Sequence, residues 1–211
     1  MFRAMSLYGR LFAAAYDRML EGVERAGLSD RRHELLSEAR GRVLEIGAGT
    51  GRNLEHYPAS VQELVLTEPE RPMAKKLEQK LAALGRSAQI VMAPAETLPF
   101  PDDSFDTVVS TLVLCTVNDP ERALAEIDRV LRPGGALLFL EHIRSDDPRL
   151  ARWQDRLHGV WVRFGHGCHC NRPTPDLIRG SALQVEQIEH GELPKSPPIT
   201  RPLVTGRALA H

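Results

Sequence analysis

Cysteine and long apolar runs are both scarce in this sequence of 211 residues. Three cysteines cannot supply the disulfide framework of a small secreted domain, and a chain of this length buries a sufficient core without one. No window approaches the roughly 20 apolar residues of a membrane-spanning helix. Because no signal-peptide pattern opens the sequence either, we expect a reducing, cytoplasmic compartment.

The sequence has no large excess of either positive or negative charge. Twenty-seven Lys and Arg residues oppose 28 Asp and Glu residues, which leaves a formal net charge of −1. The sequence contains no basic block, so a nucleic-acid backbone is not expected as a partner. The composition therefore favours a small molecule.

Apolar spacing predicts two helices ahead of the first strand, an amphipathic helix over Leu7–Val23 and a second over Ser29–Ala39 that begins at Ser29 as its N-cap. Apolar runs without polar alternation then indicate strands buried on both faces, and helical stretches between them imply a parallel sheet. The expected strands span Arg42–Ile46, Glu63–Thr67, Gln89–Ala93, Asp106–Leu112 and Ala136–Glu141, and the helices between them span Gly51–His56, Arg71–Leu84 and Pro120–Leu131.

A helix over Pro148–Phe164 and two further strands, Leu183–Glu189 and Leu203–Leu209, complete the pattern. We expect the last two strands to close the sheet edge as an antiparallel pair. The predicted fold class is α/β, with a Rossmann-like, doubly wound, mostly parallel sheet of about seven strands.

The stretch LEIGAGTGRNLEHYP places three glycines at alternate positions directly after the first strand. Glycine has no Cβ, so a ligand can approach the backbone closely there. The dinucleotide pattern G-x-G-x-x-G would need a glycine where Arg52 stands, which disfavours a pyrophosphate and an NAD-dependent oxidoreductase. Glu45 suits a ligand that carries positive charge, and Glu68 can accept hydrogen bonds from both ribose hydroxyls of an adenosine.

With AETLPFPDDSFDTVVS and EIDRVLRPGGALLFLEH, these residues resemble class I S-adenosylmethionine-dependent methyltransferases of the kind that includes ubiquinone and menaquinone C-methyltransferases. NLEHYP, STLVLCTVNDPERALAEIDRVLRPGGALLFLEH and GCHCNRPT are similar to the methyltransferase-like proteins whose animal members methylate small alkyl thiols. The second resemblance extends to about Thr174. Together they imply S-adenosyl-L-methionine as the cofactor.

The resemblance also implies which residues contact that cofactor. Glu45, Gly47, Ala48, Gly49, Gly51, Asn53, Thr111, Leu112 and Cys115 would surround the methionine part, and Glu68, Pro69, Ala95 and Glu96 would lie at the adenosine. Relatives often carry an aspartate where this chain has Pro94, so the side chain that would accept the adenine amino proton is missing. Tyr16 either closes the carboxylate end of the cofactor or belongs to the apolar stripe of its helix.

Methyl transfer from a sulfonium is an in-line displacement that needs a base only when the acceptor must lose a proton. His142, at the end of the fifth strand, either takes that proton or caps the strand. Asp106 begins the fourth strand at the opposite edge and is interpreted as structural. The loop His166–Arg172 lacks the paired C-x2-C spacing of zinc sites, so no metal is expected.

That loop, with its Cys168 and Cys170, is instead expected to form part of the acceptor pocket. Trp153, Trp161 and Phe164 on the preceding helix would line the pocket or pack against the loop. We expect a single domain over residues 1–211, in which residues 1–40 cap the cofactor site, residues 42–142 form the cofactor-binding core and residues 143–211 form the acceptor side.

The predicted function is therefore methyl transfer from S-adenosylmethionine to a small, apolar acceptor, with thiol sulfur as the first choice. An O-, N- or C-methyltransferase of a phenolic, lipid or quinol-like metabolite is a first alternative, and a non-catalytic module that binds adenosylmethionine is a second. The animal thiol enzymes begin with a hydrophobic membrane anchor, whereas this chain offers the amphipathic helix Leu7–Val23. A membrane surface is therefore the less favoured partner.

Overall fold

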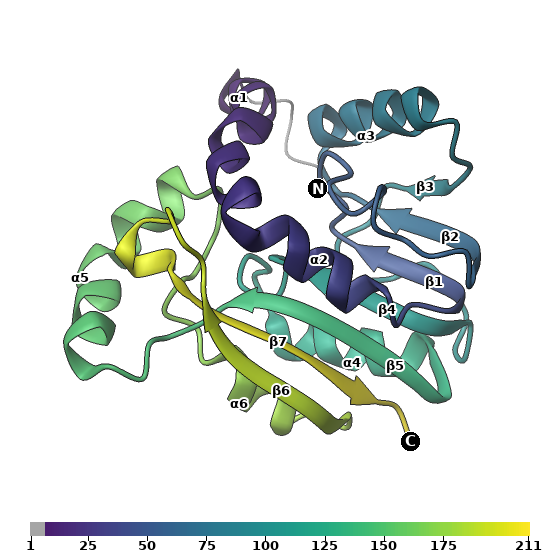
Figure 1. The fold of residues 1–211 in the computed structure, drawn as a ribbon. Helices are drawn as coiled ribbons and strands as arrows, with labels where there is room; N and C mark the ends of the chain where they lie inside the picture. The colour runs from purple at the N-terminus through teal and green to yellow at the C-terminus, as the bar shows by residue number, and fades with distance from the viewer. Residues whose placement is uncertain (1–6) are drawn as a thin grey trace.

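A seven-stranded sheet organises residues 7–211, the part of the chain that this computed structural model describes (Figure 1). The strand order is β3-β2-β1-β4-β5-β7-β6; β7 pairs antiparallel with both β5 and β6, and the other neighbouring strands pair parallel. The strands are β1 (Gly41–Ile46), β2 (Val61–Thr67), β3 (Gln89–Val91), β4 (Phe105–Thr111), β5 (Leu131–His142), β6 (Gln184–Glu192) and β7 (Pro202–Leu209). The predicted doubly wound sheet with an antiparallel edge pair is confirmed.

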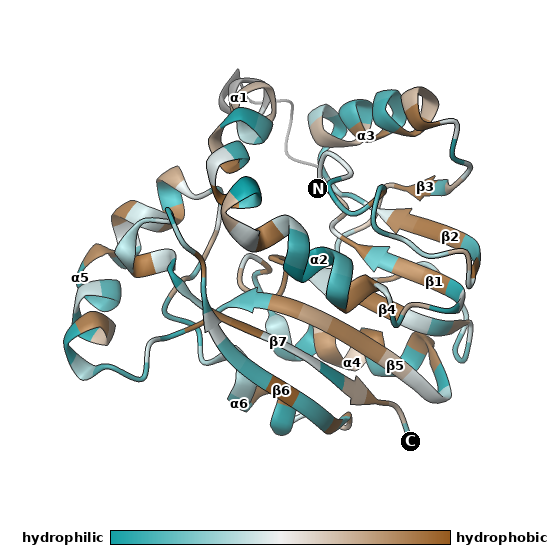
Figure 2. Ribbon diagram, viewed as in Figure 1, coloured by the Kyte–Doolittle hydropathy of each residue, from teal (hydrophilic) through white to brown (hydrophobic). Residues whose placement is uncertain are grey.

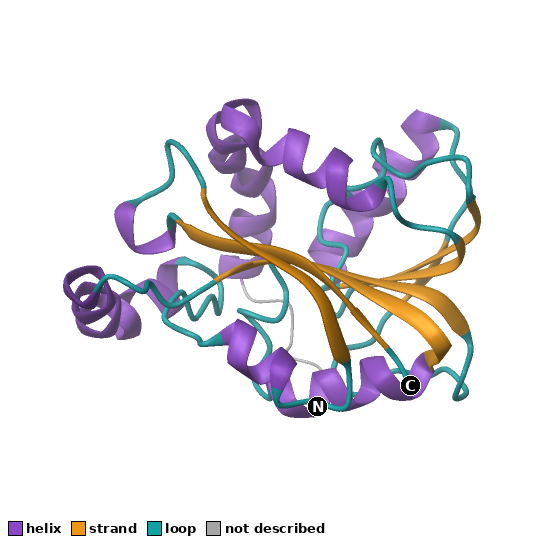
Figure 3. Cartoon of the chain, turned by 60° about the horizontal axis from the view of Figure 1, so that its bottom comes forward, coloured by secondary structure: helices purple, strands orange, loops and turns teal. Residues whose placement is uncertain are grey.

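Helices cover both faces of this sheet, as the view along its edge in Figure 3 shows. Leucines of α2 and α3 pack on one face, whereas leucine and isoleucine side chains of α4 and α6 pack on the other. The helices are α1 (Leu7–Val23), η1 (Glu24–Leu28), α2 (Ser29–Leu36), α3 (Arg71–Leu84), α4 (Pro120–Val130), α5 (Pro148–Phe164), α6 (Thr174–Arg179) and η2 (Pro198–Thr200). Figure 2 shows the apolar residues concentrated in the strands between these layers.

Two predicted helix features are corrected at the N-terminal side. Ser29 does not begin a helix as an N-cap, because its own φ and ψ are helical and η1 leads directly into α2. The break lies at Gly27, whose φ of 127° lies outside the range of helices. The second helix ends at Leu36, ahead of the predicted Ala39.

The predicted helix over Gly51–His56 is wrong, since this segment forms successive turns. The amide of His56 bonds to the carbonyl oxygen of Asn53 at 2.9 Å, three residues back, as in a turn. The structure also extends β5 back to Leu131, which bridges to Phe105 ahead of a register shift. The Pro-Gly-Gly sequence therefore marks an irregularity within the strand and not a separate connection.

The predicted N-terminal helices in residues 1–40 include residues 1–6, which lie outside the described residues. The helix predicted over Leu7–Val23 is confirmed as α1. Across residues 7–211, no helix combines the length and the apolar character needed to cross a membrane.

Candidate functional site

The glycine turn after β1 adopts backbone angles that few other residues tolerate. Gly47, Gly49 and Gly51 have φ values of 56°, 57° and 82°, in the left-handed region. A Cβ on Gly47 would lie 2.8 Å from the side chain of Val113, whereas a Cβ on Gly49 would meet only a backbone oxygen at 3.9 Å. Gly49 therefore presents bare backbone to open space, which is a cradle for a ligand.

A pocket opens at this turn, above the carboxyl ends of β1 and β4. Its lining comes from α1, α2, β1, the glycine turn and the end of β4. The lining residues are Tyr16, Arg32, Glu45, Gly47, Ala48, Gly49, Thr50, Arg52, Asn53 and Thr111. Three of them, Arg32, Thr50 and Arg52, are not among the residues predicted from the sequence.

Glu45 is the buried carboxylate of the pocket. Its Oε2 accepts a hydrogen bond from the hydroxyl of Tyr57 at 2.6 Å, and its Oε1 accepts one from Nδ2 of Asn53 at 3.0 Å. The same Nδ2 donates to Oγ1 of Thr111 at 2.9 Å, so Asn53 joins the end of β1 to the end of β4. Burial raises the pKa of Glu45 to about 7, although the bond from Tyr57 opposes the shift.

Arg32 supplies a buried positive charge to the same pocket. Its Nη1 donates to Oδ1 of Asn53 at 2.8 Å, and its Nε lies 3.2 Å from Oε1 of Glu24. Burial raises the pKa of the neighbouring Tyr16 to about 12, so its phenol stays protonated and can donate a hydrogen bond. The sequence does carry a signal for Arg32, because it stands on the apolar face that Leu28 and Leu35 define.

Glu68, at the end of β2, lies on the other side of the glycine turn. Its Oε2 accepts a hydrogen bond from the amide of Gly49 at 2.9 Å, and its Oε1 accepts one from the amide of Glu70 at 2.8 Å. Burial raises the pKa of Glu68 to about 7, against these two backbone bonds. The carboxylate is thus held beside the bare backbone of Gly49, with lone pairs left for further donors.

Asp17 fastens α1 to the site. It accepts hydrogen bonds from Oγ1 of Thr50 at 2.7 Å and from Nε of Arg52 at 2.9 Å, and Nζ of Lys76 lies 3.3 Å away. Burial alone would raise the pKa of Asp17, but the bond from Thr50 and the charge of Arg52 together lower it. Of these two neighbouring residues of α1, Tyr16 thus lines the pocket, as one of its two predicted roles requires, and Asp17 bonds to the glycine turn.

A buried carboxylate, that of Glu141, holds the backbone after β4 in place, and no role was predicted for it from the sequence. Oε1 of Glu141 accepts hydrogen bonds from the hydroxyl of Ser110 at 2.7 Å and from the amides of Val113 and Leu114 at 3.0 Å. These bonds hold the chain after Leu112, whose φ is 59°. Glu141 therefore positions the backbone that follows Thr111.

An apolar cluster begins directly beyond that segment. It contains Cys115, Cys168, Cys170 and Ile199, with Leu112, Leu150 and Trp161 packed against it. The sulfur atoms of Cys115 and Cys168 are 4.0 Å apart. The bond to Cys168 and burial raise the pKa of Cys115 well above its usual value, so this group is a thiol at neutral pH.

The two histidines of the 166–172 loop contact different partners. Nε2 of His166 lies 2.7 Å from Oε1 of Glu70, and Nδ1 of His169 lies 2.8 Å from Nε2 of His158. Within residues 7–211 no group of three or more His, Cys, Asp or Glu side chains could hold a metal ion. His166 also stacks on the ring of Phe12, so the loop reaches α1 beside the site.

Several predicted residues lie outside the lining of the pocket. Oε1 of Glu96 accepts a hydrogen bond from the amide of Asn118 at 2.9 Å and so braces the loop before α4. Ala95 is buried in the apolar core, and Pro69 is exposed after Glu68. Asp106 lies at the opposite edge, as expected, where it accepts a hydrogen bond from the amide of Arg42 at 2.7 Å.

His142 is held neutral. Burial lowers its pKa to about 4, although the backbone at Pro202 and Thr200 opposes the shift. Its Nδ1 is buried without a hydrogen-bond partner. A neutral imidazole can accept a proton, but one with so low a pKa is a weak base at neutral pH. The role of His142 as a general base stays a prediction.

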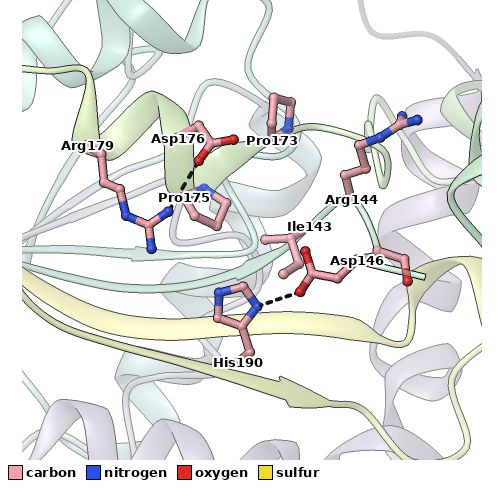
Figure 4. Close-up of a pocket in the computed structure, with 9 residues that line it drawn as sticks. Ile143, Arg144, Asp146, Pro173, Pro175, Asp176, Arg179 and His190 are labelled. Atoms are coloured by element: carbon pink, nitrogen blue, oxygen red, sulfur yellow. Dashed lines mark hydrogen bonds and ion pairs between the residues drawn. The ribbon is translucent and has the colours of Figure 1, made fainter. Parts of the chain in front are cut away.

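A second pocket lies between the segment after β5, α6 and β6 (Figure 4). Four of its side chains lie in two pairs. Nδ1 of His190 lies 3.4 Å from Oδ2 of Asp146, and Nη1 of Arg179 lies 3.2 Å from Oδ1 of Asp176. Arg144, which also lines the pocket, is engaged at 2.6 Å by Asp155 outside the lining. Each of these side chains therefore has a partner in the protein, and we assign no reaction to the pocket.

Comparisons with known proteins show which sequences and folds this chain is similar to. Residues 44–139 match the family model described as a methyltransferase domain. The chain is 33% identical to human thiol S-methyltransferase TMT1B, over 86% of this chain and 79% of that protein, and 34% identical to human TMT1A, over 79% and 70%. A crystal structure of a SAM-dependent methyltransferase from Thermotoga maritima superposes with a TM-score of 0.71 at 25% identity, covering 96% of this chain and 97% of the other.

Proposed function

Because this chain belongs to the S-adenosylmethionine-dependent methyltransferases, we propose that it methylates the sulfur of a small, apolar thiol. The protein is an enzyme, and S-adenosylmethionine is its cofactor. The choice of a thiol is supported by the two human relatives, which are named thiol S-methyltransferases.

The residues of the glycine-turn pocket fit this cofactor. Gly49 offers bare backbone, and a carboxylate stands on either side of it, Glu68 toward β2 and Glu45 toward β1. We propose that Glu68 accepts the ribose hydroxyls and that Glu45 lies near the cationic groups of the methionine part. Arg32 and the phenol of Tyr16, which line the same pocket, would then bind the carboxylate of the cofactor's methionine part.

The bound cofactor supplies an activated methyl carbon, so the protein has to align the acceptor and exclude water. Three features of this chain serve those tasks. Asp17 fixes α1 over the turn, Glu141 fixes the backbone after Thr111, and the apolar cluster around Cys115 begins where that backbone ends. That cluster is the observation that supports an apolar acceptor.

A thiol acceptor is also consistent with His142, the candidate base, being a weak one. Sulfur is intrinsically a much stronger nucleophile than a phenol oxygen, so even a small thiolate fraction at neutral pH can accept the methyl group without a strong base. A phenol, with a pKa of about 10 and a less nucleophilic oxygen, depends far more on a base that removes its proton. His142, with its pKa of about 4, is poorly suited to that demand.

Incubation with S-adenosylmethionine and a panel of alkyl thiols, phenols and quinols tests the acceptor. We expect mass spectrometry to detect methyl thioethers and no methylated phenol or quinol. Turnover of phenols or quinols in preference to thiols would overturn the thiol proposal. Cofactor binding without turnover on any acceptor would favour the non-catalytic module. Loss of thiol turnover in His142→Ala, with cofactor affinity intact, would establish His142 as the base.

Cofactor affinity is expected to fall as the pH is lowered from 7 to 6. In the unliganded protein the pKa values of Glu45 and Glu68 are raised to about 7, so their ionised forms are destabilised and both carboxyls take up protons below that pH. Binding favours the ionised forms, so the protonation of each carboxylate lowers the cofactor affinity by up to about tenfold for each pH unit below its pKa. The α-amino group of the cofactor, with a pKa of about 7.7–8.0, stays charged in this window.

Calorimetric titrations at pH 7 and pH 6, in two buffers of different ionisation enthalpy, measure this effect and the protons released on binding. Glu68→Gln is expected to remove part of the proton release and part of the pH dependence. An affinity that is constant or rises on acidification would contradict the assignment of the two carboxylates.

A further inference from the structure

Helix α5 carries an exposed apolar stripe. Trp153, Leu157, Val160 and Phe164 are 56%, 38%, 58% and 68% exposed, and their spacing of four, three and four residues places them on one face. Among the side chains that the structure describes, which leave out residues 7, 8, 10 and 11, they are four of the seven large apolar ones that are exposed. Trp153 and Phe164 are thus exposed on this face of α5, whereas Trp161, of the same helix, packs against the cysteine cluster.

The other face of α5 is firmly docked. Nε2 of the buried Gln154 donates to the carbonyl oxygens of Ile143, Cys170 and Ile199 at 3.0, 2.8 and 2.9 Å. Figures 1 and 3 both place α5 at the outer side of the molecule. Because Gln154 fixes the rotation of the helix, the apolar stripe is held facing outward.

A row of arginines borders the stripe. Arg149, Arg152, Arg156 and Arg163 are exposed, and their spacing of three, four and seven residues places them along one flank. The guanidinium of Arg156 lies 5.7 Å from the centre of the Trp153 ring. Asp155 is the acidic residue of the helix, and it is engaged by Arg144 at 2.6 and 2.8 Å and by Asn171 at 3.0 Å.

The positive charge of the arginine row indicates which of two partners, a second copy of this chain or an anionic lipid surface, fits the apolar stripe better. A second copy of this chain would bring a second set of four arginines to the same interface, where like charges repel. An anionic lipid surface instead offers phosphates to Arg149, Arg152 and Arg156 and the boundary of the acyl chains to Trp153, Leu157 and Val160. We propose that α5 binds the surface of an anionic lipid bilayer and lies in its plane.

This placement puts the bilayer on the α5 side of the enzyme. On its inner side, Trp161 of α5 packs against the apolar cluster around Cys115, and His166 of the loop after α5 contacts Glu70 and stacks on Phe12 of α1. If the proposed function holds, an apolar thiol dissolved in the bilayer would meet the enzyme on this side. That consequence rests on the proposed function, whereas membrane binding by α5 does not.

Co-sedimentation of the full 211-residue chain with vesicles tests the proposal. We expect binding to phosphatidylcholine mixed with phosphatidylserine, little binding to phosphatidylcholine alone, and weaker binding as salt is raised. The double variant Leu157→Ser, Val160→Ser is expected to lower the affinity for mixed vesicles about tenfold or more. Arg152→Gln is expected to lower it about fivefold.

The matched control is Leu84→Ser, Met92→Ser, which removes apolar groups that are 38% and 36% exposed on α3 and after β3. It should bind vesicles like the parent chain, and both double variants should keep thermal stability and cofactor affinity. Absence of binding to mixed vesicles, or an equal loss in the control, would overturn the proposal. So would light scattering that shows a dimer dissociated by the α5 variant with vesicle binding unchanged.

Discussion

Replacement of Gly49 by alanine is expected to weaken the binding of S-adenosylmethionine at least about tenfold, an effect of about 1.4 kcal/mol. Gly49 has a φ of 57°, and a Cβ built on it meets only the oxygen of Gly47, at 3.9 Å, within the pocket lining. The added methyl group would therefore occupy space that the ligand needs. It would not push the protein's own side chains apart.

Gly85 provides the matched control for this substitution. It has a φ of 60° at the end of α3, and a Cβ on it meets nothing within 4 Å. Gly49→Ala and Gly85→Ala therefore share the same left-handed backbone cost of about 1–2 kcal/mol and should lower the melting temperature alike. Gly47→Ala is unsuitable as a test, because its Cβ would lie 2.8 Å from Val113 and would disturb the fold itself.

Calorimetric titration of both variants with the cofactor and with its demethylated product gives the comparison. Full affinity in Gly49→Ala would place the ligand away from this backbone. An equal loss in Gly85→Ala would show that the effect comes from destabilisation of the fold. The expected pattern is equal stability and unequal affinity.

The strand pattern and the glycine turn could be predicted because both follow from local sequence. A strand buried on both faces is mostly apolar, and a left-handed turn favours glycine, so β1 and the turn from Gly47 to Gly51 could be recognised from the sequence. The helix predicted over Gly51–His56 failed because tertiary contacts prevail there. Arg52 bonds to Asp17, and Asn53 bonds to Glu45 and Thr111.

The walls of the pocket could not be predicted in the same way. Arg32 reaches Asn53 because α2 packs on one face of the sheet, and the sequence does not specify that packing. Glu141 bonds to the amides of Val113 and Leu114, which lie far from it in sequence. The position of Arg32 on the apolar face of its helix could have indicated that this side chain is buried. It could not have indicated that Asn53 is its partner.

Replacement of Glu68 by alanine is expected to lower cofactor affinity by about a hundredfold, the effect of losing two charge-assisted hydrogen bonds of about 1.5 kcal/mol each. Glu68 is buried between the amides of Gly49 and Glu70, at 2.9 and 2.8 Å, so its carboxylate cannot swing away from the turn. Glu68→Ala also leaves both amides without this acceptor. Some loss of stability will therefore accompany the loss of affinity.

Glu68→Gln separates these two effects. The amide side chain keeps the shape and one acceptor oxygen, but its Nε2 cannot accept a hydrogen bond from a ribose hydroxyl or from the amide beside it. We expect stability between those of the parent chain and Glu68→Ala, and an affinity about tenfold below the parent. Glu78→Ala, at an exposed position of α3, is the control and should change neither quantity.

Titrations with S-adenosylmethionine and with its 2′-deoxyribose analogue show whether Glu68 acts through the ribose. The analogue should bind the parent chain weakly, and Glu68→Ala should bind both compounds with nearly the same affinity, because the group that distinguishes them is gone. A variant that still prefers the full ribose would assign those hydroxyls to another residue. Glu68 would then serve only to hold the backbone of Gly49 in place.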